Sequence, residues 1–182
     1  MRVITGSARG RNLETLEGLD VRPTTDRVKE AMFSILHFAL PGATVLDLFA
    51  GSGQLGIEAL SRGANLCVFV DQSPKAHEVQ KRNLQATGLM PKARVIRGDY
   101  RGFLAGAKDQ YDIVLLDPPY DADLVPQALE LLSGKLRSGG IILCETDLAH
   151  LPPAHCGVFA RQKVHRFGKI AVSRYETTTP IE

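Results

Sequence analysis

The sequence contains no apolar run that approaches the length of a membrane-spanning helix, which needs about 20 consecutive apolar residues. The start, Met1 to Gly6, has neither a long apolar region nor a cleavage-site pattern, so no signal peptide is expected. These absences predict a cytoplasmic protein without a membrane partner. The 182 residues are enough for one domain with a sizeable core.

The patterns of metal-binding and redox sites are also lacking. Cys67, Cys144 and Cys156 are not spaced as a metal site or a redox pair requires. Cys67 and Cys144 lie inside apolar runs, which favours their interpretation as small buried hydrophobic residues. The five histidines are scattered, without a pair at ligand spacing. No metal is expected.

The chain has little net charge, but its basic residues are concentrated at the two ends. The formal net charge is +2. Residues 1–12 contain three arginines and no acid, and residues 161–174 contain five lysines and arginines and no acid. Basic ends on a mildly acidic body favour a polyanionic partner. The alternative is a set of solvated surface cations.

The middle of the chain alternates between strand-like and helical patterns. Runs that are apolar on both faces are typical of a parallel sheet covered by helices, and the last two strands are expected to form an antiparallel pair. The sequence therefore predicts a doubly wound α/β fold. The expected strands are Thr44–Phe49, Leu66–Asp71, Ala93–Gly98, Asp112–Asp117, Ile141–Glu145, Val158–Lys163 and Ile170–Tyr175, and the expected helices are Gln54–Arg62, Pro74–Thr87, a short segment near Arg101–Ala105, and Ala122–Leu136.

The first part of the chain is expected to form an extension of this fold. Two short strands are predicted within Arg2–Leu16, around a turn at residues 6–10. Threonines and an aspartate then follow Pro23, which is typical of a helix start. Residues 1–182 are thus predicted to be one domain, with a hairpin extension at 1–20 and a Rossmann-like core at 24–175. The expected helix buries one face, formed by Val28, Ala31, Met32, Ile35, Leu36 and Ala39.

A glycine-rich loop follows the first core strand. Gly51, Gly53 and Gly56 have the spacing G-x-G-x-x-G, between an expected strand and an expected helix, which is the context that the pattern needs to bind a nucleotide. Asp71, at the end of the next strand, is suited to accept hydrogen bonds from ribose hydroxyls. The loop is therefore predicted to hold an adenosine-containing cofactor.

The carboxylate of Asp47 helps to identify that cofactor. A dinucleotide would place its pyrophosphate near Asp47, whereas S-adenosylmethionine has no phosphate and carries a sulfonium and an ammonium group. S-adenosylmethionine is therefore favoured, and the alternatives are a dinucleotide or tight strand–helix packing without a ligand. The residues predicted to bind it here are Asp47, Phe49, Ala50, Gly51, Ser52, Gly53, Asp71 and Gln72.

A second motif, Asp117-Pro118-Pro119-Tyr120, ends a buried-strand run. Ligands of open α/β sheets bind beyond the carboxyl ends of strands, where this turn is expected. The Asp117 side chain and the Pro118 carbonyl are suited to accept both hydrogens of an exocyclic amine, which directs its lone pair at a methyl group. Tyr120 would stack on an unpaired or flipped base. The alternative is a rigid turn after a core strand.

Together these motifs resemble the RsmD family, bacterial methyltransferases of guanine N2 in small-subunit (16S) ribosomal RNA. The resemblance covers nearly the whole chain, and the Asp-Pro-Pro-Tyr turn is its least specific part because many amino-methyltransferases share it. The other matching stretches are Arg9–Arg11, Arg22–Phe33, Asp47–Gly53 and Leu55–Ala64. The most diagnostic parts are the Arg-Pro-Thr stretch at residues 22–24 and the Glu-Ala-Leu-Ser-Arg-Gly-Ala stretch at residues 58–64.

The resemblance implies a class I methyltransferase fold with a seven-stranded sheet, S-adenosylmethionine, and action on a partly assembled small ribosomal subunit. It also implies roles for further residues. The alternative roles are helix capping for residues 24–27, plain surface for Arg9 and Arg11, and a turn for Asp99. Thr24, Thr25 and Arg27 would close over the methionine end of the cofactor, and Asp99, with Tyr100, would hold the adenine. Candidate RNA contacts are Arg9, Arg11, Arg22, Lys163, Arg166 and Lys169. The family more often has Glu at the position of Asp71, which is one methylene shorter.

Other functions remain open at this point. The same turn chemistry serves methylation of adenine N6 or of a glutamine amide. A non-catalytic RNA-binding assembly factor and an NAD-dependent oxidoreductase are further alternatives. Loss of methylation with retained RNA association in an Asp117→Ala variant would exclude the assembly factor. A monomer is expected, and both basic segments are expected on the side of the Asp117 turn.

Overall fold

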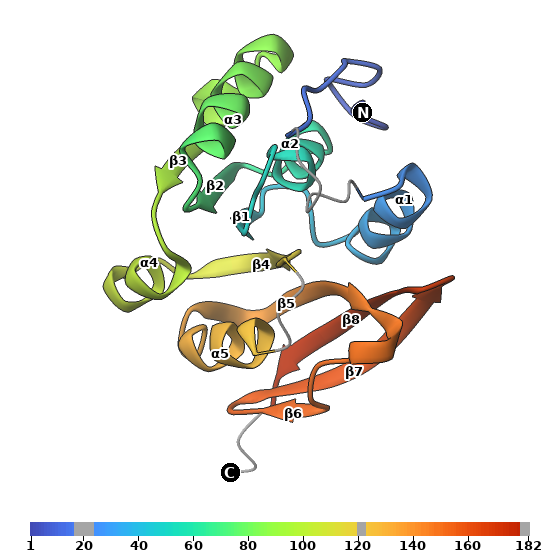
Figure 1. Cartoon of the computed structure of the whole chain (residues 1–182), viewed down its shortest axis with the longest axis vertical. Coiled ribbons are helices and arrows are strands. Elements are labelled where there is room, and N and C mark those ends of the chain that lie inside the picture. Colours follow the sequence, from blue (N-terminus) through green and yellow to red (C-terminus); the bar gives the residue numbers. More distant parts are fainter. Residues whose placement is uncertain (17–23, 120–122, 179–182) are drawn as a thin grey trace.

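The computed structural model describes residues 1–16, 24–119 and 123–178 as an α/β protein with one eight-stranded sheet (Figure 1). The strand order is β3-β2-β1-β4-β5-β8-β7-β6. The first five strands in this order run parallel, whereas β8 is antiparallel to β5 and β7 is antiparallel to β8. The strands are β1 (Thr44–Leu48), β2 (Leu66–Asp71), β3 (Ala93–Arg97), β4 (Tyr111–Leu116), β5 (Leu136–Asp147), β6 (His155–Cys156), β7 (Phe159–Phe167) and β8 (Ile170–Thr177).

Helices cover both faces of the sheet, and each face has its own core. α1, α2 and α3 pack on one face with the N-terminal extension, and α4 and α5 pack on the other. Neighbouring residues of β1 illustrate the division, since Val45 belongs to the first core and Leu46 to the second. The helices are α1 (Asp26–Ile35), α2 (Gln54–Ser61), α3 (Pro74–Thr87), α4 (Tyr100–Gly106) and α5 (Leu124–Leu131), with short 3₁₀ turns η1 (Met90–Lys92) and η2 (Leu148–His150).

The predicted α/β fold is confirmed, including the antiparallel pair at the end of the chain. Each of the seven expected strands has a counterpart in the sheet. The eighth strand, β6, has only two residues and pairs with the beginning of β7. Such a short edge strand has too little sequence for a periodic pattern, which is why it escapes prediction.

The predicted N-terminal hairpin contains one isolated antiparallel bridge, between Arg2 and Asn12. Backbone hydrogen bonds from Val3 N to the Arg11 carbonyl and from Gly10 N to the Val3 carbonyl continue the pairing. The remaining polar groups of this N-terminal extension (residues 1–16) bond mostly to helices of the core, so the hairpin is held as a docked segment.

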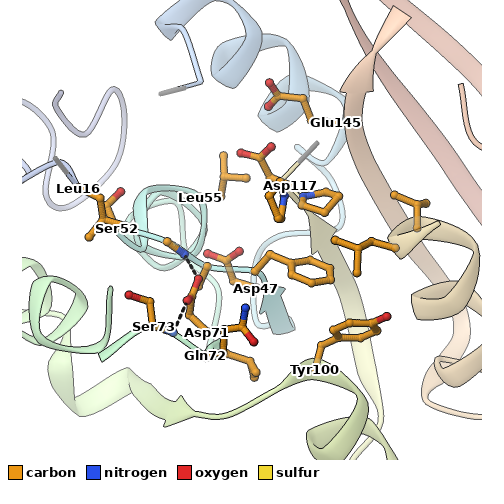
Figure 2. Close-up of a pocket in the computed structure, with 18 of the residues that line it drawn as sticks. Leu16, Asp47, Ser52, Leu55, Asp71, Gln72, Ser73, Tyr100, Asp117 and Glu145 are labelled. Atoms are coloured by element: carbon orange, nitrogen blue, oxygen red, sulfur yellow. Dashed lines mark hydrogen bonds between the residues drawn. The ribbon is translucent and has the colours of Figure 1, made fainter. Parts of the chain in front are cut away.

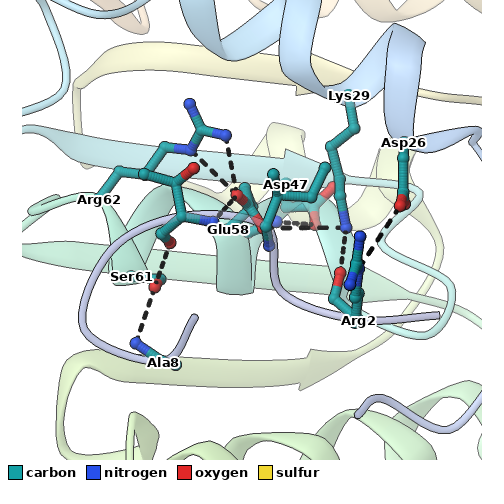
Figure 3. Close-up of polar contacts among 11 residues, drawn as sticks. Arg2, Ala8, Asp26, Lys29, Asp47, Glu58, Ser61 and Arg62 are labelled. Carbon is teal, nitrogen blue, oxygen red and sulfur yellow. Dashed lines mark hydrogen bonds and ion pairs between the residues drawn. The ribbon is translucent and has the colours of Figure 1, made fainter. Parts of the chain in front are cut away.

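A buried ionic cluster docks the beginning of the extension (Figure 3). Glu58 of α2 is fully buried and accepts hydrogen bonds from Ile4 N and Thr5 N, at 3.0 and 3.1 Å. Its carboxylate also pairs with Arg62 at 2.9 Å and with the buried Lys29 at 3.8 Å. Lys29 in turn donates to the Arg2 carbonyl at 2.8 Å. Burial lowers the pKa of Lys29, although Glu58 opposes that shift.

Ser61, at the end of α2, completes the docking contacts. Its hydroxyl accepts a hydrogen bond from Ala8 N and donates one to the Thr5 carbonyl, and its own carbonyl accepts from Ser7 N. A Cβ on Gly6 would lie 1.9 Å from the Ser61 carbonyl oxygen, so only glycine allows this approach. The Glu-Ala-Leu-Ser-Arg stretch thus carries the docking site of the extension.

Neither a membrane-spanning helix nor a metal site is present among the described residues. No helix in the described ranges is long and apolar enough to cross a membrane. Among the same residues, no group of His, Cys, Asp or Glu side chains has an arrangement suited to a metal ion.

Candidate active site

A cavity of about 930 Å³ opens at the carboxyl ends of the parallel strands (Figure 2). Both sequence motifs border it, since Asp47, Phe49 to Ser52 and Asp117 to Pro119 are among its lining residues. The two ends of the N-terminal extension, Met1 and Leu16, form part of its wall. The cavity is therefore the place where the glycine loop, the proline turn and the extension meet.

The backbone of the glycine loop adopts left-handed conformations that glycine favours. Phe49, Gly51 and Gly53 all have positive φ, at 65°, 55° and 84°. Gly53 is also the N-cap of α2. Gly56 serves packing, because a Cβ there would lie 2.3 Å from the Phe69 ring. The loop is thus a tight turn whose backbone faces the cavity.

Asp71 fixes the shape of this loop. Its Oδ2 accepts a hydrogen bond from Gly51 N and its Oδ1 one from Ser73 N, both at 2.9 Å. Figure 2 shows these two bonds beside the cavity. Each carboxylate oxygen has a further lone pair, so Asp71 is still able to accept a hydrogen bond from a ligand.

Asp47 lies deeper and is almost completely buried. Its Oδ2 accepts a hydrogen bond from Gly56 N at 2.9 Å. Desolvation by burial raises the pKa of Asp47 to about 7, the Gly56 hydrogen bond opposes the shift, and the nearby charge of Asp71 adds to it. Without a cationic ligand, this carboxyl group is therefore only partly ionised at neutral pH.

Two amide side chains of α3 support the loop from behind. Gln80 donates to the Gly51 carbonyl at 2.8 Å, and Asn83 donates to the Ser52 carbonyl at 2.9 Å. Asn83 also bonds both the N–H and the carbonyl of Glu14. It therefore joins the glycine loop to the N-terminal extension. Gln80 and Asn83 were not predicted as site residues from the sequence. Their only signal there is an amide side chain at a position that the helical spacing predicts to be buried.

The predicted adenine-binding residues lie at the rim of the same cavity. Asp99 is exposed and pairs with Arg101 at 3.2 Å. Tyr100 is buried, donates from its hydroxyl to Gln127 at 2.9 Å, and packs at 5.0 Å between ring centroids against Phe49. Gln72 is exposed and also lines the cavity.

Across the cavity, Asp117 lies beside a second acidic residue, Glu145. The Thr24 hydroxyl lies 3.2 Å from Asp117 Oδ2 and 2.9 Å from Glu145 Oε2. Glu145 was missed in the sequence because it appeared only as the end of an apolar strand. The structure places the hydroxyl of Thr24 between these two carboxylates. Its predicted role near the cofactor stays a prediction.

Four carboxylates from four neighbouring strands line the cavity in the order of the sheet (Figure 2). Asp71 ends β2, Asp47 lies in β1, Asp117 follows β4, and Glu145 lies in β5. Such a row is suited to ligands that carry positive charge or several hydrogen-bond donors.

The remaining candidates have less direct positions. Thr25 is the N-cap of α1, where its hydroxyl accepts from Val28 N, and Arg27 is exposed on the same helix. Pro118 and Pro119 line the cavity. Tyr120 and Arg22 lie outside the described residues.

The basic residues are not all close to the cavity. Arg166 and Lys169 are exposed at the β7–β8 turn, where the Lys169 carbonyl accepts from Leu148 N just beyond the end of β5. Lys163 lies further along β7. Arg9 and Arg11 are exposed on the turn that contacts the C-terminal end of α2, about 12 Å from the glycine loop along that helix.

Comparisons with known proteins agree with this architecture. The family model described as Conserved hypothetical protein 95 matches residues 1–176. Several relatives are named ribosomal RNA small subunit methyltransferase D. That of Escherichia coli (strain K12) is 35% identical, with 97% of this chain and 89% of the relative aligned, and that of Haemophilus influenzae is 39% identical, with 81% and 79% aligned. The solved structure of the protein yhhF from Escherichia coli has a TM-score of 0.87 at 31% identity and covers 97% of each chain.

Proposed function

The chain belongs to the family described as Conserved hypothetical protein 95, the RsmD family that its motifs resemble, and on this premise we propose that it methylates ribosomal RNA. The proposed methyl donor is S-adenosylmethionine. The proposed acceptor is the N2 amine of a guanine in small-subunit RNA, on an assembling particle. The observation that carries the proposal is that the glycine loop and the Asp117 turn open into one cavity.

The residues around the loop fit S-adenosylmethionine better than a dinucleotide. A pyrophosphate would face the carboxylates of Asp47 and Asp71, whereas the sulfonium and ammonium groups are cations. Asp71 is suited to accept hydrogen bonds from the ribose hydroxyls. The rings of Phe49 and Tyr100 offer an apolar surface for adenine beside Asp99.

The Asp117 turn would supply the chemistry at the acceptor. Bound S-adenosylmethionine would provide a methyl group whose bond to sulfur breaks, with the electron pair left on sulfur, as the nitrogen lone pair bonds to the carbon. Asp117 and the Pro118 carbonyl would accept the two N–H groups and stabilise the positive charge that develops on nitrogen. The surplus proton then passes to Asp117 or to water. Tyr120 would stack on the base.

The RNA would be held by exposed basic side chains. Arg166 and Lys169, at the β7–β8 turn beyond the end of β5, are the nearest candidates for phosphate contacts. The other proposed contacts are Arg9, Arg11, Arg22 and Lys163.

Two assays test the proposal separately. Isothermal titration with S-adenosylhomocysteine should give micromolar binding that Asp71→Ala weakens, because the loop loses two hydrogen bonds. Transfer of labelled methyl groups to small-subunit particles that lack the modification should require the wild-type turn. Binding without transfer to any RNA would contradict the proposed substrate, and absence of binding would contradict the proposed cofactor.

A further inference from the structure

Glu145 and Asp117 lie side by side although 27 residues separate them in the sequence. β4 and β5 are parallel neighbours, and Leu116 pairs with Cys144. The residues that follow this pair are Asp117, directly after the end of β4, and Glu145 in β5, so the two lie at the same level on neighbouring strands about 4.8 Å apart. The Thr24 hydroxyl is within hydrogen-bond distance of both carboxylates.

The position of Glu145 is unusual for a carboxylate. Its side chain is 5% exposed, and the preceding residues of β5, Ile141 to Cys144, are buried apolar side chains. Its carboxylate lines the cavity beside the turn to which we assign the acceptor amine, and its Oε2 lies 2.9 Å from the Thr24 hydroxyl. This combination points to a role in binding the acceptor.

Guanine offers a second donor next to the amine that is methylated. Its ring N1–H lies beside the N2 amine, whereas adenine has an unprotonated N1 beside its N6 amine. Resting on the function proposed above, we propose that Glu145 selects guanine by accepting the N1–H while Asp117 and the Pro118 carbonyl hold the amine. The same carboxylate would face the lone pair of N1 in adenine, and the two acceptors would repel each other. Glu145 also stabilises positive charge that spreads from N2 into the ring.

2-Aminopurine tests this assignment, because it keeps the 2-amine but has an unprotonated N1. The site is first mapped with the wild-type protein, and small-subunit RNA is then rebuilt by ligation with 2-aminopurine in place of the methylated guanine. Wild type should prefer guanine by about 10- to 100-fold in kcat/KM, the range of one good base-edge contact. Glu145→Gln should lose most of this preference, because the glutamine amide is able to donate to N1.

Matched variants separate selection from folding. Glu130→Gln makes the same change on the exposed face of α5 and should keep the wild-type preference. Glu145→Asp keeps a carboxylate and should still prefer guanine, at a lower rate. Titration with S-adenosylhomocysteine reports whether each variant keeps the cofactor pocket. If Glu145→Gln does not fold, it shows no increase in the relative rate on 2-aminopurine. The preferences of the wild type and of Glu145→Asp for guanine over 2-aminopurine then decide the question.

The outcomes distinguish this inference from the proposed function. Equal rates of the wild type on guanine and 2-aminopurine would overturn it, and so would an unchanged preference in a folded Glu145→Gln variant. Both results leave the methyltransferase function intact. If the wild type methylates no guanine in small-subunit RNA, the proposed function itself fails.

Discussion

At the scale of single residues, four of the carboxylates that line the cavity, those of Asp71, Asp47, Asp117 and Glu145, have different surroundings. Asp71 holds two backbone N–H groups of the loop, and Asp47 is desolvated with a pKa raised to about 7. Asp117 and Glu145 both lie within hydrogen-bond distance of the Thr24 hydroxyl. The first two lie on the side of the glycine loop and the last two on the side of the proline turn. This division matches the cofactor and acceptor sides that we propose.

The substitution Asp117→Asn should separate chemistry from cofactor binding. It removes the negative charge that stabilises the acceptor nitrogen but leaves the glycine loop untouched. We expect kcat to fall by about 10²- to 10³-fold, the effect of losing one such stabilising group. S-adenosylhomocysteine affinity, measured by titration, should stay close to that of the wild type. Asp109→Asn, at the exposed ion pair with Arg94, is the control that should keep full activity.

The raised pKa of Asp47 predicts a pH dependence of stability. A carboxyl group whose pKa is higher in the folded state stabilises the fold below its unfolded pKa, and this contribution is lost as the pH rises through about 7. The ligand-free wild type should therefore lose up to about 1.4 kcal/mol of unfolding free energy per pH unit from this group between pH 4 and 7. Urea unfolding of Asp47→Asn at several pH values should lack this decline, and parallel curves for both proteins would contradict the assignment.

At the scale of elements, the fold uses helix side chains to fix segments that carry no regular structure of their own. Asn83 of α3 joins the glycine loop to the extension, and Glu58 of α2 holds the beginning of the extension. The wall of the cavity formed by Met1 and Leu16 therefore depends on contacts outside the cavity.

Replacing Glu58 by Gln should detach the extension. Lys29 would then be buried without its counter-charge, and breaking a buried ion pair in this way destabilises by about 3–5 kcal/mol. Hydrogen exchange should show the largest loss of protection at residues 2–11, where Glu58 accepts two backbone N–H groups. Glu78→Gln, on the exposed side of α3, is the matched control. Unchanged protection of the extension in the Glu58 variant would contradict its docking role.

The elements differ in how far the sequence could predict them. The parallel strands and the two cavity motifs depend on local spacing, and they were found. Asn83 and Glu145 were not found, because their roles depend on partners 69 and 121 positions away, Glu14 and Thr24. The position of Arg9 could not be predicted for the same reason. Tertiary contacts with Ser61 hold its turn at the C-terminal end of α2, away from the glycine loop.

At the scale of the whole molecule, the cavity lies at the carboxyl ends of the parallel strands, and the β7–β8 turn lies beyond the same end of β5. A polyanion bound across these strand ends would contact both the turn and the Asp117 motif. Two of the basic residues near the C-terminal end of the sequence, Arg166 and Lys169, therefore lie at the same end of the strands as the cavity.

The double substitution Arg166→Gln and Lys169→Gln should weaken RNA binding without affecting the cofactor. Each lost phosphate contact lowers the steepness of the salt dependence, by roughly 0.7–0.9 in the slope of log affinity against log salt. Filter binding of small-subunit RNA at several salt concentrations measures this slope. Lys92→Gln changes an exposed lysine before β3, at the opposite edge of the sheet, and should leave the slope unchanged. Equal slopes for all three proteins would exclude the β7–β8 turn as an RNA contact.

The most direct test of the account is to identify the nucleoside that the protein makes. Small-subunit particles lacking the modification are incubated with the protein and isotopically labelled S-adenosylmethionine, and the RNA is digested and analysed by mass spectrometry. We expect labelled N2-methylguanosine, which disappears with Asp117→Asn. Labelled N6-methyladenosine instead, or no labelled nucleoside from a protein that binds S-adenosylhomocysteine, would contradict it.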